Sequence, residues 1–256
     1  ASHYQILAFN DFSYGAAAPG TSSANKHSGK RLPWSDATYG FYYPNLSDCD
    51  RQNSGQGDIP YYGEYALMNY MQGGGNNGWG RGEQHGGATN GYALYVDGTQ
   101  EPGLVASIST KAEICSGQTM YCSMWLMNPR SGSNSGAVNP IFRCNIQGRH
   151  SGDTEWENAG VYYVGEVGRD NHLGTGWQQV VFPVKSDISY DETRVQIYNF
   201  GTGGMGNDFL LDDICLYASP LPLATYHQTT GCTSYADSKT TNTVVVVRID
   251  YSQLKE

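Results

Sequence analysis

Short runs of alternating apolar and polar residues, separated by glycine- and asparagine-rich breaks, constrain the fold of this chain more than any other feature. Helical periodicity is nearly absent: the most helix-like segment, 64–71, also fits a strand and leads into a run of three glycines, which would end a helix. Eleven runs are predicted as strands: 4–9, 39–43, 62–70, 91–96, 103–109, 120–128, 139–147, 161–167, 177–184, 193–199 and 209–217. They predict an all-β protein, a β-sandwich of two antiparallel sheets, and among sandwiches a jelly roll.

The charge of the chain argues against nucleic acid as a partner. Fifteen Lys and Arg residues stand against 24 Asp and Glu, so the formal net charge is −9. Affinity for a phosphate backbone rests on clustered Lys and Arg, and no such cluster occurs along the sequence, so DNA would be repelled. No apolar stretch approaches the ~18 residues of a membrane-spanning helix, and we expect none.

Cysteine positions predict two buried thiols. Cys122 and Cys144 each alternate with apolar neighbours in a predicted strand, so we interpret them as small apolar side chains of the core rather than as disulfide partners. Cys49 and Cys232 lie in polar loops and are better candidates for a bridge.

The character of the chain changes after the last of the eleven predicted strands. Pro220 and Pro222 disfavour continued sheet pairing, and a lone valine-rich run follows at 244–251. We therefore assign the sandwich to residues 1–218 and interpret 219–256 as a linker with a final strand. That strand either docks on an edge of the sandwich or begins a truncated second domain; docking is favoured because an unpaired valine run would aggregate.

Several segments together resemble one family. Residues 206–214, with the sequence GNDFLLDDI, look like the closing strand of jelly-roll modules common in secreted Bacteroidetes proteins, and residues 6–15 are similar to their first strand. Further segments match in the same order: 90–98, 101–103, 115–119 with 123–125, 176–180 and 195–199. The resemblance covers about residues 4–218. Such modules are similar to calcium-containing carbohydrate-binding modules and to surface-adhesin repeats, which implies a secreted, periplasmic or cell-surface protein.

A calcium ion is the first chemical prediction. Asp212 alternates with Leu210, Ile214 and Leu216, so its carboxylate is expected on the face of an apolar row, where it is costly unless paired or bound to a metal. In the resembled family a structural Ca²⁺ links the first and last strands. Carried over, that site comprises Asn10, Asp11, Asp212 and Asp213.

The chain departs from the family pattern at Ser13, where the family often has Glu, so one oxygen ligand is lost. A hard cation such as Ca²⁺ needs several oxygen ligands. The alternative is that Asp212 and Asp213 accept hydrogen bonds from turn N–H groups without any metal.

A glycine-rich loop over 73–90 holds the first candidates for glycan binding. It contains Trp79 together with Arg81, Glu83 and His85, and strand alternation does not account for this tryptophan. Sugar recognition combines flat aromatic faces with amides and charged groups for the hydroxyls, so these four residues are predicted to contact a ligand. The alternative is that Trp79 only holds the loop against the sandwich.

Other loop aromatics extend the predicted ligand-binding set. Trp156 is flanked by acidic residues, and alternation turns one ring of each tyrosine pair outward. The set is completed by Trp156, Trp34, Tyr42 and Tyr62. Trp125 and Trp177, by contrast, lie inside strand patterns and are expected in the core.

Catalysis is the rival interpretation. The segment 153–157 places acidic side chains two residues apart, and same-face neighbours on a strand approach the ~5 Å separation of the carboxyls in a retaining glycosidase. A solvated acidic face explains the segment more simply. We interpret the chain as a non-catalytic carbohydrate-binding module with structural calcium, whose partners are a glycan and other domains of the same protein. The alternatives are an adhesin or scaffold module that binds protein, and a glycoside hydrolase or polysaccharide lyase.

Overall fold

The computed structural model describes thirteen stretches of the chain. They are residues 5–12, 31–32, 38–41, 60, 62–71, 82–83, 85, 91–113, 116, 118–130, 137–168, 176–202 and 206–218. The valine-rich run 244–251 lies outside them, so the division into a sandwich over 1–218 and an additional C-terminal strand stays a prediction.

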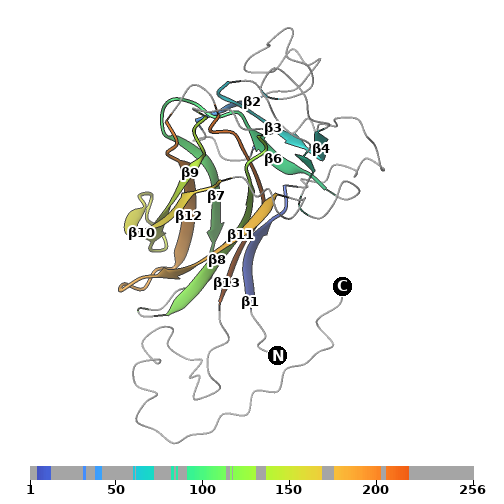
Figure 1. Ribbon diagram of the computed structural model, residues 1–256. Coiled ribbons are helices and arrows are strands. Elements are labelled where there is room, and N and C mark those ends of the chain that lie inside the picture. The colour runs from blue at the N-terminus through green and yellow to red at the C-terminus, as the bar shows by residue number, and fades with distance from the viewer. Residues whose placement is uncertain are drawn as a thin grey trace, which may run out of the picture.

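Strands make up all the regular structure of the described residues (Figure 1). They are β1 (Gln5–Asn10), β2 (Gly40–Phe41), β3 (Glu64–Met68), β4 (Tyr70–Met71), β5 (Gly82–Glu83), β6 (Ala93–Val96), β7 (Gly103–Thr110), β8 (Thr119–Met127), β9 (Ile141–Arg149), β10 (Glu157–Glu166), β11 (Trp177–Lys185), β12 (Glu192–Asn199) and β13 (Phe209–Ala218). Among the described residues, no helix of the length and apolarity needed to cross a membrane is found.

The strands form two packed sheets. The seven-stranded sheet has the order β11-β8-β13-β6-β3-β2, and its seventh strand, β1, pairs with β13. The four-stranded sheet has the order β10-β9-β12-β7. Pairing is antiparallel except between the two-residue β2 and β3, and β4 and β5 form a separate two-stranded ribbon. From β6 to β13 the chain passes repeatedly from one sheet to the other, which is the crossing pattern of a jelly roll. The predicted all-β jelly-roll sandwich is confirmed.

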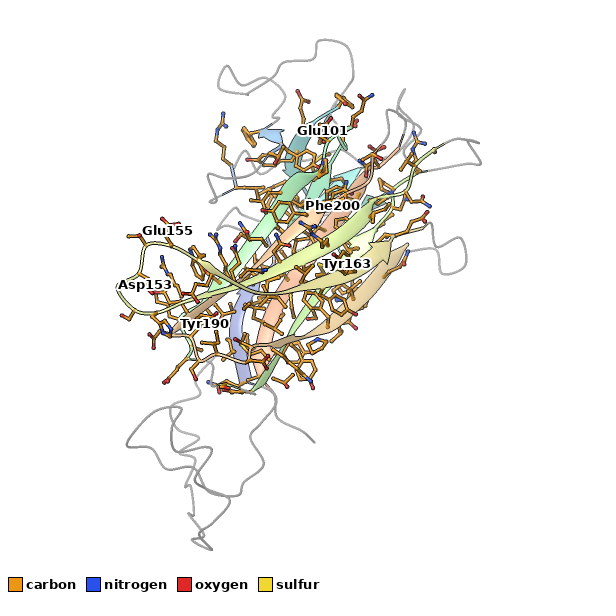
Figure 2. The ribbon with its side chains drawn as sticks, turned by 90° about the vertical axis from the view of Figure 1, so that its left-hand side faces the viewer. Glu101, Asp153, Glu155, Tyr163, Tyr190 and Phe200 are labelled. Carbon is orange, nitrogen blue, oxygen red and sulfur yellow. The ribbon has the colours of Figure 1, made fainter. Side chains whose placement is uncertain are left out.

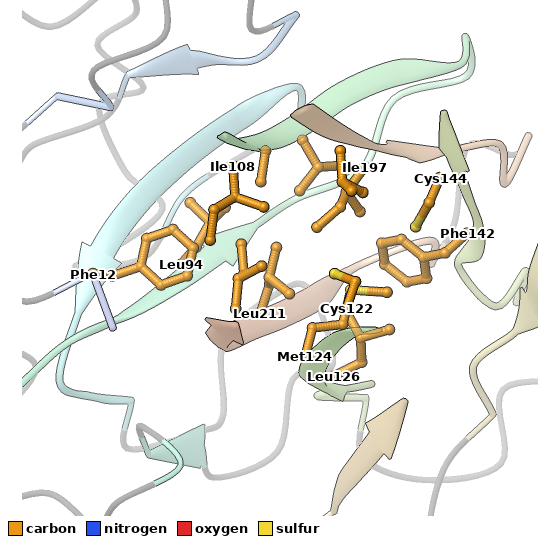
Figure 3. Close-up of a cluster of buried hydrophobic side chains, with 14 of the residues drawn as sticks. Phe12, Leu94, Ile108, Cys122, Met124, Leu126, Phe142, Cys144, Ile197 and Leu211 are labelled. Carbon is orange, nitrogen blue, oxygen red and sulfur yellow. The ribbon is translucent and has the colours of Figure 1, made fainter. Parts of the chain in front are cut away.

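Apolar side chains on the inner faces of both sheets fill the space between them (Figure 3). Cys122 of β8 and Cys144 of β9 are part of this core, and both are buried free thiols, as predicted. Burial raises the pKa of the Cys144 thiol to about 12, so it stays protonated and unreactive. Cys49 and Cys232 lie outside the described residues.

A second, smaller apolar cluster covers the outer face of the seven-stranded sheet. Its buried residues are Ala66, Met68, Ala93, Tyr95, Met127, Trp177 and Leu210, and Trp125 packs against them half-buried. They alternate along their strands with residues of the main core. Trp177 is buried in this second core cluster, as predicted, and Trp125 packs half-buried against it. Both lie on the side of the seven-stranded sheet opposite the main core.

Strand boundaries differ from the prediction at several places, and the predicted strand 62–70 is divided into β3 and β4. β10 begins at Glu157 rather than at residue 161, since the acidic stretch before it continues directly into sheet pairing with β9. The short strand β5 lies inside the glycine-rich loop, where low strand propensity concealed it. β5 is a strand because its backbone pairs with β4, and the local sequence gives no sign of that pairing.

Buried carboxylates gather where β6 ends and β13 begins. Asp97 and Asp208 are almost fully buried, as is Glu64. The backbone N–H of Gly98 donates to Asp208 Oδ1 at 3.2 Å, and Arg130 Nε lies 3.7 Å from Asp208 Oδ2. Loss of hydration, followed by the charge and hydrogen bond of Asp208, raises the pKa of Asp97 to about 9. The proton on Asp97 lets the two carboxyl groups share a hydrogen bond instead of repelling each other.

Stability is expected to fall as pH rises. The folded protein keeps a proton on Asp97 between about pH 4 and pH 9 that the unfolded chain has released, so the free energy of unfolding decreases with pH over that interval. Asp97→Asn mimics the protonated acid and should flatten this dependence, raising stability at pH 9 relative to the parent by at least about 1 kcal/mol. Urea unfolding at about pH 5, 7 and 9 measures the effect.

Asp187→Asn serves as the control, because Asp187 is exposed and the change removes the same charge. It should leave the pH dependence of the parent intact. An Asp97→Asn protein that loses stability with pH as steeply as the parent would contradict the assignment.

Candidate functional site

The outer face of the four-stranded sheet carries the candidate site. Along β9 the side chains at 142, 144 and 146 are buried in the core, and on β12 those at 195 and 197 are. Because strand side chains alternate, the residues between them point away from the core. These outward residues of the two central strands are Arg143, Asn145, Gln147, Arg149, Glu192, Arg194, Gln196 and Tyr198.

Trp156 lies at one end of this face, in the connection from β9 to β10. Figure 2 views the molecule from this side, with the β9–β10 connection projecting at one edge. The guanidinium carbons of Arg149 and Arg194 each lie 4.5 Å from the centroid of the Trp156 ring. Arg149 also forms an ion pair with Glu192 through its Nε and terminal nitrogens. These contacts hold the indole against the sheet instead of leaving it in solvent.

A second aromatic group lies farther along the same face (Figure 2). The guanidinium of Arg143 stacks over the Phe200 ring at 4.0 Å, and Tyr198 lies 6.2 Å from that ring. In the register of the sheet, Arg143 pairs with Tyr198 on one side and with Tyr163 of β10 on the other. Tyr163 is 72% exposed, so its ring is open to a ligand.

Amide side chains fill the space between the two aromatic groups. Asn145 pairs in register with Gln196, and Gln147 with Arg194. Arg194 Nε donates to Gln147 Oε1 at 2.6 Å, while the buried Asn145 Oδ1 has no hydrogen-bond partner among the described residues. The face thus combines aromatic rings for stacking with amides and guanidinium groups for hydrogen bonds.

The predicted metal residues lie elsewhere, on the first and last strands and on the turn after the first. β1 pairs with β13, and Asn10 lies opposite Ile214 in that ladder. The Asn10 side chain caps the turn that follows β1, because its Oδ1 accepts the N–H of Phe12 at 2.9 Å. Asp11 is exposed at this turn, and its charge acts on Asp212.

His85 joins this junction from the glycine-rich loop. Its backbone N–H donates to Asp212 Oδ2 at 2.9 Å, and its ring Nδ1 lies 2.8 Å from Asp213 Oδ2. The imidazole also stacks on Trp125, with centroids 3.8 Å apart, and meets Trp177 edge-on. His85 therefore ties its loop to the outer face of the seven-stranded sheet, far from Trp156 in the fold.

A β-bulge decides where Asp212 points. The register of β13 shifts between Asp212 and Cys215, and Asp213 adopts a φ of 48°. The expectation that Asp212 shares a face with Ile214 and Leu216 is therefore wrong: those two face the core, while Asp212 lies on the opposite face with Leu210. The extra residue of a bulge reverses the alternation that the sequence implies.

Burial raises the pKa of Asp212 to about 8. The negative charges of Asp213 and Asp11 also raise this pKa, whereas the hydrogen bonds that Asp212 accepts from the backbone N–H groups of His85 and Asp213 lower it. A cation placed here would favour the ionised carboxylate. Among the described residues, no three His, Cys, Asp or Glu side chains are arranged to hold a metal together. Any calcium here would therefore need backbone and amide oxygens as well.

The structure separates the predicted ligand-binding residues. Trp156 lies on the four-stranded sheet, whereas His85 lies on the seven-stranded one. Tyr62 stands in the turn before β3, partly exposed, where its hydroxyl accepts the Gln100 N–H at 3.1 Å. Glu83 belongs to β5, but its side chain is not described. Three further predicted residues, Trp34, Tyr42 and Trp79, lie outside the described residues, as does Arg81.

The acidic side chains considered for catalysis do not share one strand. Asp153 and Glu155 lie exposed in the connection between β9 and β10, and only Glu157 enters β10. Figure 2 shows the first two at the tip of that connection. The strict same-face geometry that made the pair a candidate therefore does not exist.

Sequence reasoning missed most of the outer face. Arg143, Asn145 and Gln147 occupy every second position of β9, between buried residues. That alternation predicts that the three side chains face away from the core, but it does not indicate which side chains of other strands lie beside them. Tyr163 and Tyr198 join them from β10 and β12 through sheet pairing, which no local pattern reveals.

No protein-family model matches the sequence, and no curated protein matches it. Among solved structures, the chain is similar to a cyclase from Fischerella sp. in its apo form, with 10% identity, a TM-score of 0.43 and coverage of 86% of this chain and 89% of that one. It is also similar to the CBM22-1-CBM22-2 tandem of Paenibacillus barcinonensis Xyn10C, with 11% identity, a TM-score of 0.37 and coverage of 90% and 50%.

A third similar structure is the CBM22-1 and GH10 modules of xylanase 10B from Clostridium thermocellum, complexed with xylohexaose. The identity is 12%, the TM-score is 0.30, and the match covers 54% of this chain but only 23% of that one. The chain thus spans less than a quarter of that relative. All three TM-scores are below 0.5.

His85→Ala is expected to destabilise the protein by about 1–2 kcal/mol, because it removes the stack on Trp125 and the contact with Asp213. Urea unfolding followed by tryptophan fluorescence measures the loss. His150→Ala is the matched control: its side chain is 52% exposed and 3.7 Å from Asp191, so the cost should stay below about 0.5 kcal/mol. Equal effects of the two substitutions would contradict the anchoring role.

Proposed function

We propose that this chain is a carbohydrate-binding module that holds a glycan on the outer face of its four-stranded sheet. The observation that carries the proposal is the combination on one surface of exposed Tyr163, the aromatic group around Phe200, Trp156 and the amides between them. Aromatic rings stack on the apolar face of a sugar, and amide and guanidinium groups bind its hydroxyls. A secreted or cell-surface location is part of this proposal.

The position of the face supports binding rather than catalysis. The central outward positions hold a single carboxylate, Glu192, which is already paired with Arg149. Asp153 and Glu155 are exposed on the connection at its edge, and Glu166, opposite Ile141 at the end of β10, accepts a hydrogen bond from Asn139. A general acid needs a position over the scissile bond, and these carboxyl groups on the described part of the face are either paired or at its edges.

Substitutions on the face should abolish glycan binding without unfolding the protein. Tyr163→Ala removes an exposed ring and should weaken the Kd for a bound polysaccharide at least about tenfold. Affinity electrophoresis through a panel of soluble plant, algal and bacterial polysaccharides measures this effect. The same gels, followed by an assay for reducing ends, report any turnover.

Tyr121→Ala is the matched control, because Tyr121 stacks on Tyr217 on the outer face of the other sheet, with centroids 5.5 Å apart. It should bind as the parent does. If the parent binds no polysaccharide of the panel, the glycan proposal fails and a protein-binding adhesin becomes the better interpretation. Release of reducing ends would replace the binding module by an enzyme.

We further propose that a structural calcium ion binds where β1 meets β13. Asn10 and Asp11 lie on β1 and the turn after it, and Asp212 and Asp213 lie on β13, which pairs with β1. Their carboxylate and amide oxygens are ligands that Ca²⁺ accepts. Bound calcium would supply positive charge beside the buried Asp212 carboxylate and favour its ionised form.

Calcium should raise the melting temperature. A ligand that binds only the folded state at about 100 times its Kd adds about 2.7 kcal/mol of stability, which corresponds to several degrees for a domain of this size. Differential scanning calorimetry in EDTA, in calcium and in magnesium measures the shift. Asp212→Asn should remove it, whereas Asp187→Asn, an exposed site elsewhere, should keep it. Identical melting temperatures in EDTA and in excess calcium would contradict the proposal.

A further inference from the structure

We infer that the glycan bound by the outer face of the four-stranded sheet is an acidic polysaccharide, held through the carboxylates of its uronate sugars by Arg143 and Arg194. This inference rests on the proposed function and names the class of glycan. Its basis is the distribution of charge, the fixed placement of the guanidinium groups and the unsatisfied polar atoms of the face.

Positive charge is concentrated on this face. The described residues contain seven Lys and Arg side chains, and three of them, Arg143, Arg149 and Arg194, lie on the neighbouring strands β9 and β12. The outward positions of those two strands hold only one acid, Glu192, so their formal charge is three minus one, or +2. Glu166, opposite Ile141 on β10, places a second acid at one end of the same face. A chain with a net charge of −9 therefore carries local positive charge on the two central strands of this sheet.

Aromatic rings hold the guanidinium groups in place. Arg194 lies over Trp156 and donates to the neutral Gln147, and Arg143 lies over Phe200. Stacked arginines lose little further side-chain freedom when a ligand arrives. Their planar N–H groups match the two oxygens of a carboxylate, so the face is preorganised for this group rather than for a neutral hydroxyl alone.

Two polar atoms in the middle of the face lack partners. Arg143 Nε and Asn145 Oδ1 are both buried without a hydrogen bond among the described residues, and they belong to alternate outward positions of one strand. Folded proteins rarely leave such groups unsatisfied, because a buried polar atom without a partner has lost its hydrogen bonds to water. A ligand that offers a carboxylate to Arg143 and a hydroxyl to Asn145 would satisfy both.

The spacing of the arginines requires a polymer. Arg194 pairs in register with Gln147, four residues along β9 from Arg143, which corresponds to about 13 Å along the strand. This distance exceeds the width of one sugar ring. A single polysaccharide chain lying along the strands can therefore present separate acidic sugars to Arg143 and Arg194, with Tyr163 beside the first.

Nucleic acid fits the protein less well than an acidic glycan. Its phosphates are dense, so binding needs an extended basic surface, whereas the two central strands of this face carry a formal charge of only +2 in a chain with a net charge of −9. An acidic polysaccharide carries fewer negative charges per unit length than a nucleic acid. Its carboxylates can bind the two arginines without bringing further negative charge close to the rest of the protein.

The test compares one polysaccharide in charged and neutral form. Isothermal titration calorimetry is run with polygalacturonate and with its fully methyl-esterified form, and then with alginate and its propylene glycol ester. The parent should bind each acid at least about tenfold more tightly than the ester. Raising sodium chloride from about 0.05 M to about 0.5 M should weaken binding of the acid but not of the ester.

Charge-removing variants locate the effect. Arg143→Gln and Arg194→Gln should each weaken binding of the acid about fivefold to tenfold and leave binding of the ester nearly unchanged. Lys185→Gln removes the same charge from an exposed position on β11 of the other sheet and should bind as the parent does. Circular dichroism and urea unfolding show that each variant is folded.

The outcomes separate this inference from the proposed function. Equal affinity for acid and ester overturns the inference and leaves the carbohydrate-binding function standing. Binding of dextran sulfate or duplex DNA as tight as that of polygalacturonate also overturns it, because the face would then recognise any polyanion. If no polysaccharide binds, charged or neutral, both the inference and the proposed function fail.

Discussion

Apolar contact between the inner faces of the two sheets is the interaction on which everything else in this protein depends. β8 and β13 present one side to β9 and β12 across the core, and every buried residue of that core belongs to one continuous cluster. Because strand side chains alternate, burying one face of each strand commits the other face to the outside. The outer face of the four-stranded sheet is thus free to carry chemistry, and its polar and aromatic residues are not needed for the core.

The two halves of the last strand, β13, pair with different strands on one side. Its first half pairs with β6 and its second half with β1, while β8 runs along its other side. The bulge at Asp212 and Asp213 marks the change between the halves and turns two carboxylates toward His85. One irregularity in the ladder therefore brings together the first strand, the last strand and the glycine-rich loop, which is where a cation would have the greatest structural effect.

Average charge is a poor guide to what this surface can bind. The acidic excess of the chain correctly argues against an extended phosphate-binding surface, yet it conceals a local reversal of sign. Arg143 and Arg194 are 51 positions apart in the numbering, and only the pairing of β9 with β12 makes them parts of one face. The field that a ligand meets is set by the few groups nearest to it, because water and salt screen the more distant ones.

Local alternation and the turn-forming breaks determine the class of fold, the position of most strands and the burial of Cys122 and Cys144, because each depends on a period of two residues and on the conformations that glycine allows. The sequence also identified Trp156 and the acidic residues of β13 as unusual. Tertiary structure alone decided which of them meet. The bulge that turns Asp212 away from Ile214, and the pairing that sets Tyr163 beside Arg143, arise from hydrogen bonds between segments distant in the chain. Such bonds depend on sheet register, and register is decided by the packing of the whole sandwich.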